Sequence, residues 1–276
     1  MQTGPIGVFD SGYGGLTVLK SLARALPAYD FIYLGDNARA PYGTRSYETV
    51  YQYTKSCVDW FFKQGCPLVI LACNTASAKA LRTIQQHDLH QYGSEKRVLG
   101  VIRPTAEIIG NYSQSGHIGI LATPGTVASN SYRMEIEKYF PAALVTQQSC
   151  PLWVPLIENN EHHSSGATYF IHDCVQKLLQ QDDKIDTVLL GCTHYPIIAN
   201  QIKAALPPHV RIITQGDIVA DSLKDYLQRH SDMDTLLNKS AKLSFYTTDD
   251  TADFNAHAPM FFGKAINAHQ AIISLA

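Results

Sequence analysis

Short apolar runs alternate with segments of helical periodicity along most of the chain. Runs such as 69–71 and 188–190 are continuously apolar, as in strands that are buried on both faces. Segments such as 16–26 and 47–63 instead carry apolar residues at helical spacing. Further strands are expected at 5–9, 31–34, 98–102, 210–214 and 243–247, and further helices at 75–86, 127–139, 168–179 and 217–230. This alternation predicts an α/β protein with mainly parallel sheets flanked by helices.

The second half of the chain repeats the order of the first. Each half opens with an Ile-Gly strand and a glycine-containing turn before a helix, and each later has a strand that ends in a cysteine. We interpret this repeat as two similar lobes that face each other, with the active site in the cleft between them. The first lobe is expected to comprise residues 1–98 and 212–276, and the second lobe residues 99–211. The last expected strand, 243–247, then folds back onto the first lobe.

Composition narrows the class of protein. The 276 residues are 45% hydrophobic and 17% charged, with a formal net charge of −2, which indicates a globular protein without a general basic surface for nucleic acid. The sequence contains neither an apolar run of membrane-spanning length nor a signal-type leader. Its six cysteines form neither a C-x-x-C pair nor a zinc-ligand spacing. We therefore expect reduced thiols in a cytoplasmic protein and no metal site.

Two of the cysteines stand where parallel strands should end. Cys73 is followed by Asn74 and Thr75, and Cys192 by Thr193 and His194. Ligands of open α/β sheets bind at the carboxyl ends of the strands, so the pair predicts a site with a thiol on each side. A cysteine in such a place is otherwise a small packing residue. His194 could share the proton of the Cys192 thiol, or simply be satisfied by the backbone.

The turn Asp10-Ser-Gly-Tyr-Gly-Gly15 places a carboxylate, a hydroxyl and free N–H groups at a helix N-terminus. Three interpretations remain open at this point. It could be a dinucleotide-binding turn with Asp36 at the ribose, a structural turn, or a site for a small carboxylate in which Asp10 pairs with an ammonium group. The loop Pro41-Tyr-Gly43 is equally compatible with a plain turn, and Thr123 and Thr126 with helix capping.

A cysteine hydrolase with Cys192 as nucleophile and His194 as base is the main competing arrangement of these residues. Side chains two positions apart at a strand end are expected to point in different directions, which disfavours it. It also gives Cys73 no role.

Taken together, the motifs resemble those of glutamate racemase, the cofactor-independent branch of the aspartate/glutamate racemases. They occur in the family's order between about residues 6 and 220, and the segment 150–158 also fits. The motifs are Asp10-Ser-Gly-Tyr-Gly-Gly-Leu-Thr-Val-Leu19, Asp36 with Pro41-Tyr-Gly43, Ala72-Cys-Asn-Thr-Ala-Ser77, Thr123-x-x-Thr126 and Gly191-Cys-Thr-His-Tyr-Pro196.

The resemblance implies an enzyme that interconverts L- and D-glutamate for peptidoglycan synthesis, without a cofactor and as a homodimer. Cys73 and Cys192 would act on opposite faces of the α-carbon and exchange roles with direction. Asp10 would face the ammonium group or tune Cys73, and His194 would tune Cys192. The expected α-carboxylate ligands are Ser11, Asn74, Thr75 and Thr193; the side-chain carboxylate would lie at Tyr42 and Gly43 beside Pro41; Thr123 and Thr126 complete the substrate set, with Asp36 and Glu158 as supporting residues.

Three other functions stay open on the sequence. A related racemase for aspartate or a hydantoin would differ in substrate preference, which a change at Tyr42 would probe. A non-catalytic amino-acid-binding protein would bind glutamate without exchanging its α-hydrogen. A nicotinamide enzyme would change the fluorescence of bound nicotinamide.

Overall fold

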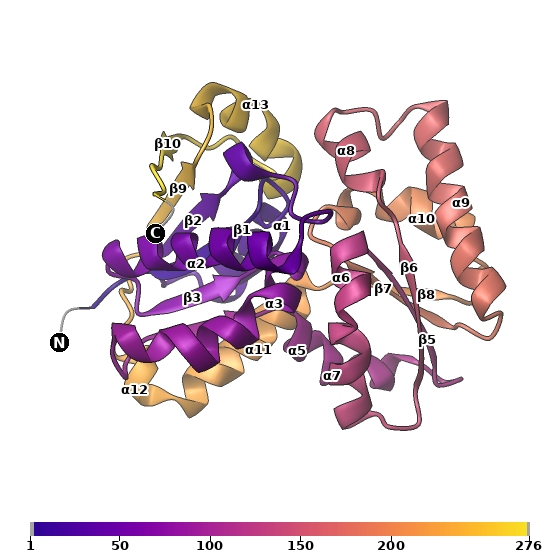
Figure 1. The fold of residues 1–276 in the computed structure, drawn as a ribbon, viewed down its shortest axis with the longest axis horizontal. Helices are drawn as coiled ribbons and strands as arrows, with labels where there is room; N and C mark the ends of the chain where they lie inside the picture. The colour runs from indigo at the N-terminus through magenta and orange to yellow at the C-terminus, as the bar shows by residue number, and fades with distance from the viewer. Residues whose placement is uncertain (1–2, 275–276) are drawn as a thin grey trace.

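The computed structural model describes residues 3–274, which form two lobes that lie side by side, each built on a parallel sheet between helices (Figure 1). The first lobe holds a six-stranded sheet in the order β10-β9-β2-β1-β3-β4, and the second lobe a four-stranded sheet in the order β6-β5-β7-β8. The strands of the first sheet are β1 Ile6–Asp10, β2 Phe31–Gly35, β3 Leu68–Leu71, β4 Arg97–Gly100, β9 Leu243–Thr247 and β10 Ala268–Gln270. Those of the second are β5 His117–Ala122, β6 Leu144–Ser149, β7 Thr187–Gly191 and β8 Arg211–Ile213. The predicted fold class is confirmed.

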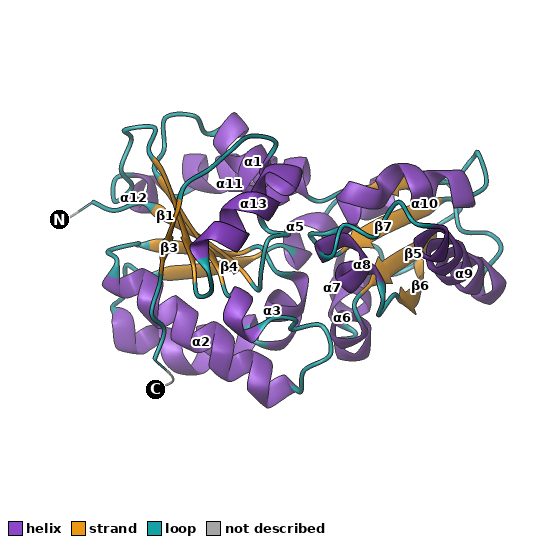
Figure 2. Cartoon of the chain, turned by 90° about the horizontal axis from the view of Figure 1, so that it is seen from above, coloured by secondary structure: helices purple, strands orange, loops and turns teal. Residues whose placement is uncertain are grey.

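Helices cover both faces of each sheet (Figure 2). In the first lobe, α2 and α3 lie on one face, and α1, α11 and α13 lie on the other. The helices are α1 Leu16–Ala25, α2 Tyr47–Lys63, α3 Asn74–Lys79, α4 Leu81–Thr83, α5 Ile102–Ala106, α6 Pro124–Ser129, α7 Ser131–Tyr139, α8 Trp153–Glu158, α9 Ser165–Gln181, α10 Ala199–Ala205, α11 Gly216–Arg229, α12 Ser231–Asp234 and α13 Thr251–Phe262.

Continuous apolar runs form the central strands because both of their faces are covered. In β1, Val8 belongs to the core under α1 and α11, whereas Phe9 belongs to the core under α2. All five residues of β1 and of β7 are buried. Alternate side chains of a strand point to opposite faces, so a strand packed on both sides must be apolar throughout.

Both sheets change winding direction at the strand that starts them. β1 pairs with β2 on one side and β3 on the other, and β5 pairs with β6 on one side and β7 on the other. Such a switch point leaves a crevice at the carboxyl ends of two neighbouring strands, because the connections that follow these strands run to opposite sides. The crevices lie after β1 and β3 in the first lobe and after β5 and β7 in the second.

The chain passes between the lobes twice. It leaves the first sheet after β4, at Val101, and returns after β8, at Gln215, directly before α11. The expected strand 98–102 is therefore wrong in its last residues: β4 ends at Gly100, and Ile102 already lies in α5, whose Pro104 stands in the first turn, where proline fits a helix.

Three other expectations need correction. The predicted helix 127–139 is two helices, because Asn130 adopts a left-handed conformation with φ of 54°, which asparagine tolerates better than most residues. The predicted helix 75–86 begins at Asn74 but its first segment ends at Lys79, and α4 and a π-helical turn follow. The strand 243–247 is present but does not end the fold, since α13 and β10 come after it.

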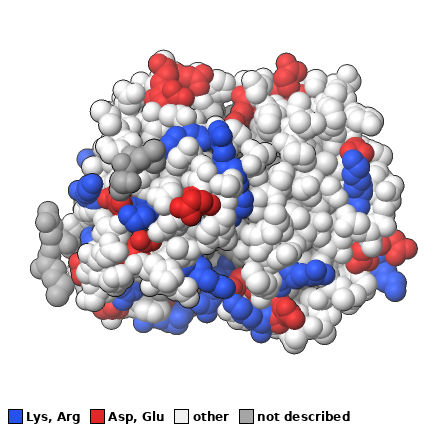
Figure 3. Space-filling model, in the orientation of Figure 1, with Lys and Arg blue, Asp and Glu red and all other residues white. Residues whose placement is uncertain are grey.

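Charged side chains of both signs are dispersed over the surface. On the face shown in Figure 3, Lys and Arg are interspersed with Asp and Glu, and a large part of the surface is uncharged. Over residues 3–274, none of the helices combines the length and apolar character that crossing a membrane requires.

Candidate active site

The two crevices face each other across one small cavity of about 80 Å³. Pockets for drug-sized ligands are typically about 300–1,000 Å³, so this volume suits a small metabolite. Twelve of the residues predicted from the sequence line the cavity: Ser11, Pro41, Tyr42, Gly43, Cys73, Asn74, Thr75, Thr123, Glu158, Cys192, Thr193 and His194. Asp10, Asp36 and Thr126 lie behind this lining and contact it.

Cys73 stands at the end of β3 and is the N-cap of α3. Its sulfur accepts a hydrogen bond from the N–H of Ala76 at 3.5 Å, and its thiol donates to Ser11 Oγ at 3.6 Å. Burial and the nearby carboxylate of Asp10 raise the pKa of Cys73 to about 12, despite the opposing contacts with Ala76 and Ser11. Cys73 is therefore a neutral thiol at pH 7 in the unliganded protein.

Cys192 belongs to a three-residue chain on the other side of the cavity, in which Cys192 and His194 are buried and Glu158 is half-buried. Its sulfur lies 3.8 Å from His194 Nδ1, and His194 Nε2 lies 2.8 Å from Glu158 Oε1. Burial alone would lower the pKa of His194, but the contacts with Cys192 and Glu158 outweigh it, and the pKa is raised well above the usual value. The imidazole is consequently protonated at pH 7 and places a positive charge beside the Cys192 sulfur.

The expectation that Cys192 and His194 point in different directions is wrong. β7 ends at Gly191, and the chain turns immediately toward a 3-10 helix that begins at Tyr195. In an extended strand, side chains two positions apart lie on the same face, so strand geometry did not oppose this contact, and the turn after Gly191 keeps the two groups together. Phe261 of α13 packs edge-on against the His194 ring, with 5.3 Å between the ring centroids, and so restricts the imidazole.

Asp10 is completely buried at the end of β1. Its carboxylate accepts hydrogen bonds from the N–H of Gly12 at 3.1 Å and from Thr193 Oγ1 at 3.3 Å, so it ties the turn of the first lobe to the cysteine segment of the second. Burial raises the pKa of Asp10, against the influence of His194. In this position Asp10 acts electrostatically on Cys73 rather than from the cavity surface.

The loop Asp36–Thr44 lies over one end of the cavity. Asp36 is fully buried, accepts two hydrogen bonds from Arg39 Nε at 2.7 and 3.0 Å, and accepts the phenolic hydroxyl of Tyr42. Since the Tyr42 hydroxyl is committed to Asp36, the loop meets the cavity through its backbone and the tyrosine ring. A cis peptide bond joins Ala40 to Pro41.

Three threonines close the lining between the lobes. Thr75 Oγ1 lies 2.9 Å from Thr123 Oγ1 and 3.4 Å from Thr126 Oγ1. The Thr75 hydroxyl, two residues after Cys73, therefore contacts the turn that caps α6. The N–H of Gly125 also donates to the carbonyl of Gly43 at 2.7 Å. The contacts join the first lobe to the second directly at the cavity.

The sequence analysis missed seven lining residues: Ala40, Thr44, Pro124, Cys150, Pro151, Val154 and Pro155. Four of them come from the segment 150–158, whose fit to the family motifs was the available signal. It also missed α13, whose Asp253 accepts the Tyr13 hydroxyl at 2.6 Å and whose Phe254 and Phe261 stack on the Tyr13 ring.

The cavity lining offers mainly neutral polar groups. Within residues 3–274, the cavity lining includes no Lys or Arg, and its polar groups are hydroxyls, an amide, thiols, His194 and Glu158. Across the same residues, no group of three or more His, Cys, Asp or Glu side chains is arranged to hold a metal ion.

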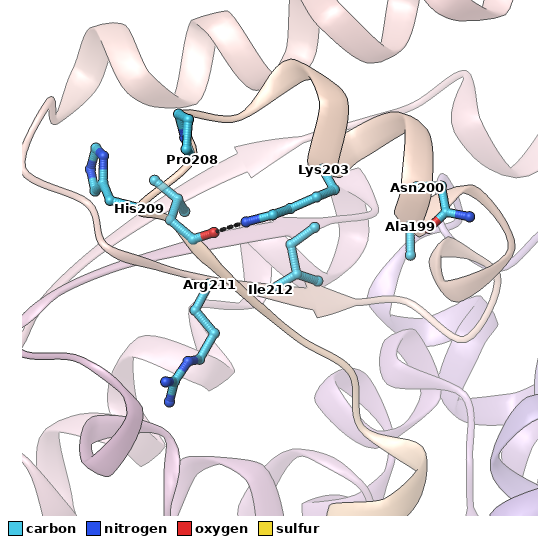
Figure 4. A pocket seen from close by; sticks show the side chains of 8 residues that line it. Ala199, Asn200, Lys203, Pro208, His209, Arg211 and Ile212 are labelled. Atoms are coloured by element: carbon cyan, nitrogen blue, oxygen red, sulfur yellow. Dashed lines mark hydrogen bonds between the residues drawn. The ribbon is translucent and has the colours of Figure 1, made fainter.

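A larger hollow of about 460 Å³ lies on the second lobe between α10 and β8 (Figure 4). Lys203 lines this hollow, but its ammonium group is already engaged, because Lys203 Nζ donates to the carbonyl of Val210 at 2.6 Å. Arg211 extends away from the hollow, and its guanidinium lies 5.8 Å from the Tyr112 ring. None of the predicted site residues lines it, so size alone does not identify the functional site.

Comparison with known proteins agrees with this geometry. Residues 6–223 match the family model of Asp/Glu/Hydantoin racemase. A glutamate racemase from Dinoroseobacter shibae is 40% identical over 271 residues, which covers 95% of this chain and 96% of the relative. The crystal structure of glutamate racemase isoform RacE1 from Bacillus anthracis has a TM-score of 0.88 at 31% identity, covering 99% of this chain and 98% of that one.

A glutamate racemase from Francisella tularensis, solved in complex with D-glutamate, has a TM-score of 0.86 at 33% identity and covers 100% of this chain and 99% of that one. The family match spans strands β1 to β4 of the first sheet, the whole second sheet and every motif at the cavity, from the turn after β1 to the cysteine segment after β7. The chain therefore belongs to the Asp/Glu/Hydantoin racemase family.

Proposed function

We propose that this protein is a glutamate racemase that interconverts L- and D-glutamate by proton transfer at the α-carbon between two cysteines. The observation that carries the proposal is that Cys73 and Cys192 come from different lobes and line the same small cavity. The relatives named glutamate racemase and the structure of one of them with D-glutamate support the choice of substrate.

Inversion of an α-carbon requires a proton to leave one face and another to arrive on the opposite face. A single base would have to cross the plane of the substrate, whereas groups on opposite walls need only small motions. In the proposed reaction one thiolate takes the α-hydrogen, and the opposite thiol donates its hydrogen to the other face. The two cysteines then hold exchanged protonation states, which suit the reverse reaction.

The resting protonation of the cavity fits this scheme. Cys73 is a neutral thiol, and on the opposite side the protonated His194 lies next to the Cys192 sulfur. A proton donor therefore stands on one side of the cavity, and a positive charge faces the second sulfur on the other side. Positioned proton transfer contributes roughly 10²–10⁴-fold to a rate, so stabilisation of the developing negative charge must supply the remainder.

The proposed ligands of the α-carboxylate are the hydroxyl and amide donors that follow the strands, namely Ser11, Asn74, Thr75 and Thr193. The side-chain carboxylate is proposed to bind the backbone of the loop at Tyr42 and Gly43, with Thr123 beside it. Fixed neutral donors in a closed cavity stabilise charge that appears only in the transition state without the cost of reorganising water. This chemistry needs no cofactor.

Incubation with each glutamate enantiomer in D₂O, without added cofactor, tests the proposal. We expect loss of optical purity with uptake of deuterium at the α-carbon, and loss of both in Cys73→Ser and Cys192→Ser. Cys174→Ser is the matched control, because Cys174 is a buried thiol of α9 outside the cavity lining. Exchange of aspartate but not glutamate would contradict the substrate, and exchange of neither would contradict the reaction.

By the same family relationship, we propose that the enzyme acts in the cytoplasm as a homodimer and supplies D-glutamate to peptidoglycan synthesis. Depletion of the protein should make growth depend on added D-glutamate. Sedimentation equilibrium of the purified protein should give twice the mass of the chain.

A further inference from the structure

Gln215 occupies a central position between the lobes. It lies on the second passage of the chain between them, directly before α11, and is only 4% exposed. Its side chain reaches the first passage: Nε2 donates to the carbonyl of Val101 at 3.1 Å, and Thr105 Oγ1 lies 3.0 Å from the same nitrogen, where it can only share one of the two amide hydrogens. One buried amide therefore contacts both segments that connect the lobes.

The same amide closes a ring of three hydrogen bonds with Asn74 and Tyr132. Asn74 Nδ2 donates to Gln215 Oε1 at 2.8 Å, Gln215 Nε2 donates to the Tyr132 hydroxyl at 2.6 Å, and that hydroxyl donates to Asn74 Oδ1. All three side chains are buried, Asn74 at the start of α3 and Tyr132 in α7. The ring therefore spans the two lobes.

A backbone carbonyl sets the direction of every bond in this ring. The carbonyl of Val101 can only accept, so the Gln215 amide must turn its nitrogen toward Val101 and its oxygen toward Asn74. The oxygen of Gln215 in turn requires the nitrogen of Asn74. With its Oδ1 taken by Tyr132 and one Nδ2 hydrogen taken by Gln215, Asn74 keeps one N–H for the cavity that it lines.

We propose that Gln215 is a positioning residue that fixes the Asn74 amide so that an N–H, and not the carbonyl oxygen, faces a carboxylate of the substrate. This rests on the proposed function, which brings a carboxylate to this wall of the cavity. Because Tyr132 belongs to the second lobe, the ring also makes the orientation of Asn74 depend on the relative placement of the lobes. Separation of the lobes would release Oδ1 and allow the amide to rotate.

A double-mutant cycle on Gln215→Met and Asn74→Ala tests the proposal. Methionine keeps the length of glutamine but cannot hold the ring. We expect Gln215→Met to raise KM for both enantiomers roughly 10- to 100-fold, the range for losing a hydrogen bond to a charged group, with kcat changed by a few-fold at most. In the Asn74→Ala background the same substitution should have no further effect on KM. Equal effects of Gln215→Met in both backgrounds would overturn the proposal.

Thr105→Val controls for a general disturbance of the connecting segments. It removes a neighbour of Gln215 Nε2 but leaves the ring intact, so KM should stay at the wild-type value; Tm is measured in parallel. A rise in KM for Thr105→Val equal to that for Gln215→Met would assign the effect to the connecting segments and overturn the role of the ring.

Side-chain amide resonances in a ¹⁵N-labelled sample provide a readout that does not require activity. The Asn74 pair is identified by its disappearance in Asn74→Ala. In the wild type we expect one of the two hydrogens to exchange slowly with water, and in Gln215→Met both to exchange fast. If the wild type fails to racemise glutamate, the proposed function fails, but this measurement still decides how the Asn74 amide is oriented. Unchanged exchange of the Asn74 amide pair in Gln215→Met would refute the role of Gln215 as a positioning residue.

Discussion

The Tyr42 hydroxyl donates its hydrogen bond to the buried carboxylate of Asp36, although the tyrosine itself lines the cavity. This contact turns the polar end of Tyr42 away from the substrate. Asp36 also accepts from Arg39 and from Thr248 Oγ1 at 2.9 Å, so it holds the whole loop rather than a ligand. In the proposed function, recognition at this end of the cavity then depends on the course of the backbone at Tyr42 and Gly43.

Tyr42→Phe should therefore keep the KM for glutamate close to the wild-type value. The lost hydrogen bond to Asp36 should lower the free energy of unfolding by about 1 kcal/mol. Gly43→Ala is the informative comparison, since its added Cβ would lie 2.9 Å from the Thr123 Cβ and would displace the loop backbone. Steady-state kinetics with L- and with D-glutamate measures the KM of both variants. A large rise in KM for Tyr42→Phe would mean that the hydroxyl does reach the substrate.

Glu158→Gln should move the alkaline limb of the pH profile to lower pH. Glu158 is one of the two contacts that raise the pKa of His194 above its usual value despite burial. Activity that needs the imidazolium is present below that pKa and is lost as pH rises through it, so removing the carboxylate brings the loss to a lower pH. The profile of kcat/KM against pH measures the shift.

Asp173→Asn provides the charge control for that experiment. Asp173 lies on α9 and pairs with Lys177 at the surface, so its removal changes net charge by the same amount. The alkaline limb of the pH profile of Asp173→Asn should coincide with that of the wild type. If the alkaline limb of Glu158→Gln also coincided with the wild type, His194 would not control the profile.

Gly14→Ala should reduce activity strongly. A Cβ at this position would lie 2.3 Å from Thr193 Oγ1 and 2.4 Å from His194 Nδ1, closer than side-chain atoms can approach. The substitution must displace His194 from Cys192, which we expect to lower kcat at least tenfold, since a misplaced catalytic group costs up to about 10²-fold. Gly166→Ala, whose Cβ would meet nothing closer than 3.8 Å in α9, should keep full activity.

Asp186→Asn should destabilise the second lobe in a pH-dependent way. The carboxylate accepts from Ser113 Oγ at 2.6 Å and from the N–H groups of Gln114 and Ser115 at 2.7 Å each. Burial raises the pKa of Asp186, but these hydrogen bonds outweigh it and hold the pKa well below its usual range. Stability from this group is present above its unfolded pKa of about 3.9 and is lost as pH falls through the lower folded value.

At neutral pH the Asp186→Asn protein should therefore unfold about 2–4 °C below the wild type, for a loss of about 1 kcal/mol. The difference should shrink as the pH is lowered below about 3. Thermal unfolding at both pH values measures it, and Asp225→Asn, in an exposed pair with Arg229, should leave Tm nearly unchanged. A difference in Tm that is the same at both pH values would contradict the attribution of this stability to the ionised carboxylate of Asp186.

The sequence was sufficient to place Cys73 and Cys192 together, because each follows a continuous apolar run at the carboxyl end of a strand, where ligands bind, and the repeat predicts two lobes that face each other. It was insufficient where a contact depends on packing between distant segments. Gln215 stands in a stretch without a motif, and its partners Asn74 and Tyr132 lie far from it along the chain. The hydrogen bond that turns Tyr42 toward Asp36 has no local pattern that would reveal its direction.

The missed helix α13 has a physical explanation. Its residues are apolar on several sides and it contains Pro259, so its helical periodicity is weak. It is stabilised mainly by contacts with α1 and Tyr13, which are remote in sequence. The lobe boundaries 1–98 with 212–276 and 99–211 stay a prediction.

The return of the chain to the first sheet has a consequence for synthesis on the ribosome. β2 is paired on its outer side only by β9, which begins at Leu243, so roughly 200 residues must be made before that edge is covered. At about 5–20 residues per second, the wait is on the order of 10–40 s. During this time all four strands of the second sheet emerge consecutively and can assemble, while an apolar strand edge of the nascent first sheet stays open to pairing with other chains.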